Sequence, residues 1–121
     1  MPSVLERPDA AGLLETARDV LLRELLPHLP EAKRFEARMV ANAMAVARRD
    51  MAADAAPVLA RLRELLASPG AEPDALLRRL AAEIRAGERD PGTPGHAAAA
   101  EALVELARLR CAVSNPRALG R

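Results

Sequence analysis

Residues 30–49, PEAKRFEARMVANAMAVARR, form the stretch that decides the fold. It contains Phe35, the only aromatic residue of the chain. At 3.6 residues per turn, one face of a helix here carries a mostly apolar stripe made of Phe35, Met39, Asn42 and Val46. Arg38 lies one turn before Asn42, beside this stripe. We expect the stripe to be buried against the rest of the protein, with Asn42 as its one polar member.

The composition predicts an all-α protein. Half of the 121 residues are hydrophobic, with one Phe and no Trp or Tyr, so the core is aliphatic. Leu and Ala dominate, and both are strong helix formers. There are few β-branched residues and no alternation with a period of two, as strands would require. We therefore expect residues 1–121 to form a single domain, a compact bundle of about five amphipathic helices. Up-and-down and more orthogonal arrangements both stay open.

Start and stop signals divide the chain into helices over residues 10–26, 30–53, 56–67, 73–86 and 93–114. The expected start residues are Asp9, Pro30, Asp54, Pro73 and Thr93. Gly87 is placed to end the fourth helix in a left-handed cap. The remaining segments are an N-terminal arm (1–8), a flexible loop (88–96) and a short tail (116–121).

Each of the other helices also carries an apolar face. The residues expected to point inward are Leu13, Leu14, Ala17, Val20, Leu21 and Leu25 in the first helix, Leu59, Leu62, Leu65 and Leu66 in the third, Leu76, Leu77, Leu80 and Ile84 in the fourth, and Ala102, Leu106, Leu109 and Val113 in the fifth, where Leu103 and Ala107 widen the face. Arg18 and Arg23 of the first helix are expected to point outward.

The charge balance argues against a dedicated nucleic-acid binder. The chain has 18 basic and 17 acidic residues, which gives a formal net charge of +1, whereas such binders carry a clear basic excess. With a single aromatic residue, the chain also lacks platforms for stacking bases. Nearly all the basic residues are Arg, which fits either a GC-rich genome or the recognition of phosphate and carboxylate groups.

The chain has one cysteine, Cys111, so it can form no internal disulfide, and a reducing compartment is the natural location. The N-terminal residues do not show the pattern of a signal peptide, and no apolar run is long enough to span a membrane. We expect a cytoplasmic protein.

No arrangement of residues indicates catalysis or metal binding. The candidate metal ligands, His28, His96 and Cys111, are scattered over a corner, a helix start and a helix end, where three or four convergent ligands are needed. No serine lies in a recognisable context with a histidine. The glycines of DPGTPG (90–95) lack the Lys-Ser/Thr end of a phosphate-binding loop. We predict no catalytic residues, no cofactor and no metal, and the balance leans against an enzyme.

One small polar patch deserves a functional hypothesis. Arg38 and Asn42 are one turn apart, and Arg85 at the end of the fourth helix is a possible third member. Guanidinium groups bind planar anions through two parallel hydrogen bonds, so this trio would suit a carboxylate, a phosphate or a protein partner. The structural alternative is that Asn42 is an amide bonded to the backbone of a neighbouring helix or placed at an exposed rim.

Four segments resemble one family in the same order: RPDAAGLLETARDVLLRELLPHLP (7–30), RFEARMVANAMAVARRD (34–50), IRAGERD (84–90) and LRCAVSNPR (109–117). The family is a bacterial group of small helical proteins known only as a domain of unknown function. The segment with Phe35, Arg38 and Asn42 is the most specific of the four. Members are often encoded beside aminoglycoside-phosphotransferase-like kinases and acyl-CoA dehydrogenases. The resemblance implies this metabolic context and no established activity.

Two functions from different classes follow. The first is an accessory module that binds a larger enzyme, either a kinase-like phosphotransferase or an acyl-CoA-metabolising protein, with a homodimer as a further expectation. The second is a binder of a small anionic ligand, or an enzyme, that uses Arg38, Asn42 and Arg85.

Overall fold

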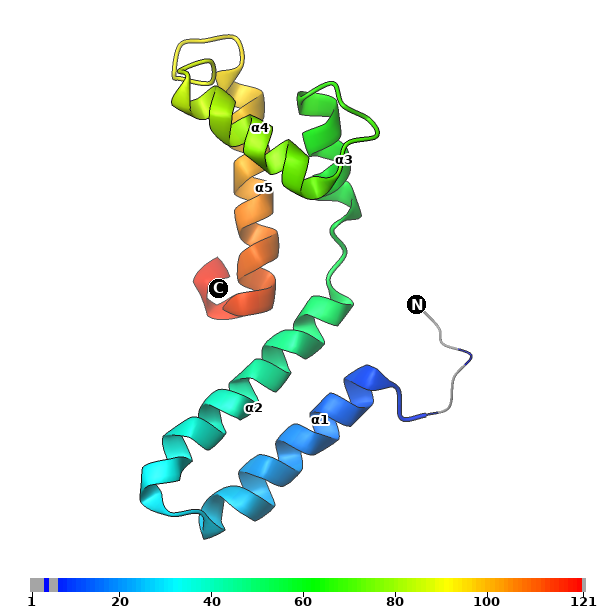
Figure 1. Cartoon of the computed structure of the whole chain (residues 1–121), viewed down its shortest axis with the longest axis vertical. Coiled ribbons are helices and arrows are strands. Elements are labelled where there is room, and N and C mark those ends of the chain that lie inside the picture. Colours follow the sequence, from blue (N-terminus) through cyan, green and yellow to red (C-terminus); the bar gives the residue numbers. More distant parts are fainter. Residues whose placement is uncertain (1–3, 5–6, 121) are drawn as a thin grey trace. The chain divides into compact units, whose positions relative to one another are not determined.

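The computed structural model describes residue 4 and residues 7–120 of the chain. These residues form five α-helices and no strand, which confirms the all-α prediction. The chain divides into two compact units, Met1–Ala53 and Asp54–Arg121, each described here by itself (Figure 1). The single-domain organisation stays a prediction, as does the N-terminal arm, which lies largely outside the described residues.

The first unit is a helical hairpin. Helix α1 (Ala10–Val20) continues through a π-helical turn, η1 (Leu21–Leu25), and a 3-10 turn, η2 (Leu26–His28), before the chain reverses into α2 (Glu31–Ala52). Figure 1 shows α1 and α2 side by side. Asp9 begins α1 as predicted, because its carboxylate accepts the Gly12 N–H at 2.9 Å. Pro27 falls within η2, where its missing N–H prevents the helix from continuing.

The buried face of α2 differs from the one that the sequence predicts. Its fully buried residues are Ala37 (7% exposed) and Ala41 (2%), on the side that packs against α1. Phe35 is 70% exposed, Met39 is 53% exposed, and Asn42 is also exposed. The physical reason is that a two-helix hairpin has a single seam, and small residues on that seam allow the two helices to approach closely. Among the described residues of the first unit, none buries the side chains of Phe35 and Met39.

The buried face of α1 also differs from the predicted one. Leu14 and Leu21 are partly buried, but Leu13, Ala17, Val20 and Leu25 of the predicted face are exposed. Arg18, predicted to point outward, is half-buried, and its Nε donates to the Ala41 carbonyl of α2 at 3.2 Å. A guanidinium with a long aliphatic stem can cover apolar surface in this way.

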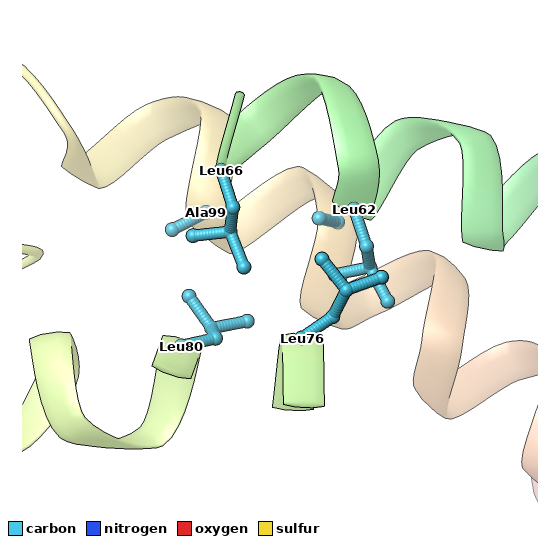
Figure 2. Close-up of a cluster of buried hydrophobic side chains, with 6 residues drawn as sticks. Leu62, Leu66, Leu76, Leu80 and Ala99 are labelled. Atoms are coloured by element: carbon cyan, nitrogen blue, oxygen red, sulfur yellow. The ribbon is translucent and has the colours of Figure 1, made fainter. Parts of the chain in front are cut away.

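The second unit contains the larger core. It is built by α3 (Ala56–Leu65), α4 (Pro73–Arg85) and α5 (His96–Ser114), and a 3-10 turn, η3 (Pro116–Leu119), follows α5. Figure 2 shows the cluster at its centre, whose members are Leu62, Leu66, Leu76, Leu80, Ala99 and Ala102. The four leucines confirm the predicted faces of the third and fourth helices. Ile84, predicted to be inside, is 41% exposed, because it lies near the end of α4 beyond this cluster. Leu103 and Ala107 of α5, also predicted to be inside, are exposed, because they lie beside the strip of α5 that carries Ala99 and Ala102 and not on it.

The ends of α3 and α4 use the same backbone motif with different residues. At the end of α4 the Glu88 N–H donates to the Glu83 carbonyl at 3.0 Å, and Gly87 has φ of 81°, the predicted left-handed cap. At the end of α3 the Ser68 N–H donates to the Arg63 carbonyl at 2.9 Å. The left-handed residue there is Ala67, with φ of 49°. Left-handed backbone is costly for any residue with a Cβ atom.

The start of α5 differs from the prediction. Thr93 does not cap the helix, because its hydroxyl donates to the Asp90 carbonyl at 2.7 Å, and α5 begins at His96 with Gly95 as its N-cap. The loop between α4 and α5 is held by Arg89. This side chain donates to Glu83 Oε2 from Nε (3.1 Å) and Nη2 (2.9 Å), and from Nη1 to the Gly95 carbonyl (3.2 Å). The predicted flexibility of residues 88–96 stays a prediction.

Candidate functional site

Phe35, the most exposed large apolar residue of α2, and Met39 share one face of that helix. Phe35 and Met39 are one turn apart, and Val46 follows two turns later with a half-buried side chain. Arg38 and Asn42 lie along one edge of the same face. We call these five residues the α2 patch. Exposing the only aromatic residue of a chain to 70% is unusual, since burial of such a ring is strongly favourable.

Arg38 and Asn42 are available for binding. Both are exposed, and neither side chain has a polar partner among the residues that the structure describes. Asn42 is therefore not an amide bonded to a neighbouring helix, as in the first form of the structural alternative, since an amide of that kind would be covered and hydrogen-bonded. Their arrangement one turn apart, beside an apolar ring, combines an apolar body with polar edges, as protein-binding surfaces commonly do.

Arg85 lies in the last turn of α4, in the second unit, and is exposed there. It is close to the negative end of the helix, where a cation is favourable. Its grouping with Arg38 and Asn42 in one anion site stays a prediction.

A groove of about 440 Å³ lies between α1 and α2, and sequence reasoning missed it. Its charged side chains already have partners. Arg48 pairs with Glu15 across the groove at 3.2 Å, and Arg18 is bound to the Ala41 carbonyl. Arg48 is thus paired with a carboxylate, and the Arg18 Nε is already bonded to a backbone carbonyl. Its pairs hold the hairpin together, each contributing the modest energy of a surface interaction.

Within the described part of the chain, no group of three or more His, Cys, Asp or Glu side chains could hold a metal ion. Cys111 is a free, partly buried thiol on α5. Over the same residues, no helix combines the length and the apolar character that crossing a membrane requires.

A family model described as a domain of unknown function (DUF6285) matches residues 27–118 of the chain. The chain belongs to the DUF6285 family. The match includes α2, α3, α4 and α5, so the α2 patch lies inside the region that defines DUF6285, while α1 precedes it. No curated protein and no solved structure matches the chain. Membership of DUF6285 confirms that the chain belongs to a family of unknown function, and it assigns no activity.

Proposed function

We propose that the protein is a non-enzymatic interaction module that binds a larger protein through the α2 patch. The single observation that supports this most is the exposure of Phe35 beside Met39, which no described residue of the first unit covers. Aromatic residues dominate the energetics of protein interfaces, and Met adapts its shape to a partner. Arg38 and Asn42 would supply the polar contacts at the edge that fix orientation.

The proposed partner is a kinase-like phosphotransferase or an acyl-CoA dehydrogenase. This choice rests on the gene context that the sequence resemblance implies. In this proposal the protein is bacterial and located in the cytoplasm, and it needs no cofactor of its own.

Isothermal titration with each purified candidate partner tests the proposal. The chain offers a matched pair of variants, because Met39 and Met51 are both 53% exposed on α2 but only Met39 belongs to the patch. Replacing Phe35 and Met39 together by Ser should weaken binding at least roughly 30-fold, as expected for a loss of about 2 kcal/mol at an interface hot spot. Met51→Ser should bind like the wild type. If neither candidate binds, or if the double variant binds like the wild type, the proposal is wrong.

We also propose that the chain self-associates. Helix α5 leaves a second apolar face exposed, with Val104 and Leu103 among the exposed large hydrophobic residues of the second unit. An uncovered apolar face of this kind is a common basis for a homodimer.

The second candidate function is the binding of a small anion by Arg38 and Asn42, with Arg85 as a third member. It is supported by the absence of polar partners for Arg38 and Asn42 among the described residues. In this function, phosphate should raise the melting temperature of the wild type, and Arg38→Ala should abolish that rise while leaving the fold intact. Equal stabilisation of both proteins by phosphate would reject this function.

A further inference from the structure

Helix α5 carries two apolar faces. One holds Ala99 and Ala102 in the core of the second unit. The other, which we call the α5 face, consists of Ala100, Leu103, Val104, Ala107 and Cys111. Val104 is 52% exposed and Leu103 is 38% exposed. A helix that is apolar on two sides normally lies between two partners, and the described residues of the second unit leave Leu103 and Val104 exposed.

We propose that a second copy of this chain covers the α5 face, with the two α5 helices antiparallel about a two-fold axis near residue 105. This inference rests on the self-association included in the proposed function and assigns its interface. In this register Leu103 lies opposite Ala107 of the second copy, and Ala100 lies opposite Cys111 of the second copy. Leu103 thus meets a small residue, and the other pair joins two small residues, so the two helices can approach closely.

The charges beside the α5 face are complementary to themselves in the same register. Glu101 and Arg108 lie on the same edge of α5, about two turns apart. In an antiparallel pair, each edge meets the same edge of the other helix, so Glu101 faces Arg108 of the second copy and Arg108 faces its Glu101. A parallel pair would bring opposite edges together and would not form these two contacts.

Both charged groups are accessible for such contacts. Arg108 is exposed and has no side-chain partner among the described residues. Glu101 contacts Arg61 at 3.3 Å, but its side chain is still 70% exposed, so one carboxylate oxygen can accept a further bond. A free cation and an exposed anion, spaced to satisfy each other on a two-fold related copy, favour a second copy over a partner of unrelated sequence.

The expected interface is small. The 19 residues of α5 are about 28 Å long at 1.5 Å per residue, and one helix pair of this length covers less than the roughly 800 Å² per partner of a standard interface. The dimer should therefore be weak and depend on protein concentration.

Sedimentation equilibrium over a concentration series, with charge-reversed variants of the full chain, tests this interface. Arg108→Glu places two Glu pairs at the interface, and Glu101→Arg places two Arg pairs there. Each variant alone should dimerise roughly tenfold more weakly than the wild type, since two attractive contacts become repulsive. A mixture of the two variants should recover wild-type affinity, because every contact in the mixed dimer again joins Glu to Arg. Arg78→Glu, an equal change of charge on α4, is the control and should leave dimerisation unchanged.

Disulfide trapping tests the direction of the helices. In the antiparallel register the two Cys111 residues are about 18 Å apart along the axis, far beyond the roughly 7 Å that a disulfide can bridge between Cα atoms. Mild oxidation should therefore leave the wild type uncrosslinked, whereas Ala100→Cys should form a covalent dimer through Cys111 of the second copy.

Each possible outcome supports or overturns a stated part of the proposed dimer. Crosslinking of the wild type through Cys111 would overturn the antiparallel arrangement. If the chain dimerises, but Arg108→Glu does not weaken the dimer and Ala100→Cys does not crosslink it, the α5 interface is wrong and self-association stands. A chain that stays monomeric at every concentration would overturn both, while the binding of a partner by the α2 patch would be judged separately by titration.

Discussion

Replacing Phe35 by Ala should lower the free energy of unfolding by about 1 kcal/mol or less. With 70% of the residue exposed, about 30% of a surface of roughly 200 Å² is buried, or roughly 60 Å². At about 25 cal/mol per Å², that area contributes at most about 1.5 kcal/mol, and the better helix propensity of Ala recovers about 0.5 kcal/mol. A fully buried Phe would instead cost about 3–5 kcal/mol.

Ala41→Leu is the matched variant on the opposite face of α2. Ala41 is 2% exposed on the seam with α1, so the added side chain overpacks the hairpin and should cost about 1–3 kcal/mol. Urea denaturation followed by far-ultraviolet circular dichroism measures both changes. The buried stripe expected from the sequence would reverse the order, with Phe35→Ala costly and Ala41→Leu nearly neutral. That reversed order would refute the hairpin packing described here.

Three further predictions concern the second unit and are checked by the same denaturation measurement. Ala67→Gly should raise stability by about 0.5–1 kcal/mol and Gly87→Ala should lower it by about 1–2 kcal/mol, because both positions have left-handed backbone; equal signs for the two would contradict the capping argument. Arg89→Met should cost about 2 kcal/mol, because Glu83, whose side chain is 16% exposed, then keeps only its 3.5 Å contact with Arg79; hydrogen exchange in residues 88–96 should also accelerate, and unchanged exchange would show that Arg89 does not hold the loop. Leu76→Ala should cost about 3–5 kcal/mol, since Leu76 is 1% exposed in the central cluster; a loss below about 1 kcal/mol would contradict the core assignment.

Local signals in the sequence predict the existence of all five helices and several of their ends. Asp9 and Gly87 act through hydrogen bonds and backbone angles within a few residues, so their roles can be predicted without knowing the tertiary structure. The prediction that Thr93 caps the fifth helix was wrong, and the reason is also local. Its hydroxyl has a competing local acceptor, the Asp90 carbonyl, and a threonine can satisfy a turn as readily as a helix start.

The buried face of a helix could be predicted less reliably from the sequence than its ends. In α2 the apolar stripe with Phe35 and the small-residue face with Ala41 both have helical periodicity, and hydrophobicity favours the stripe. The hairpin buries the Ala face because close approach of the backbones requires small side chains. Asn42, the polar member of the stripe predicted to be buried, and Arg38 beside it both lie on an exposed surface. Exposure of the stripe depends on what packs against α2, which periodicity does not contain.

Native mass spectrometry of the tagged chain, isolated gently from its own cells, tests the central claim most directly. The wild type and Met51→Ser should each carry a second protein in fixed stoichiometry, and the variant with Phe35 and Met39 replaced by Ser should lose it. A second protein retained by that variant would contradict binding through the α2 patch. A wild-type chain that carries no other protein, or only a small-molecule adduct, would contradict the interaction module itself.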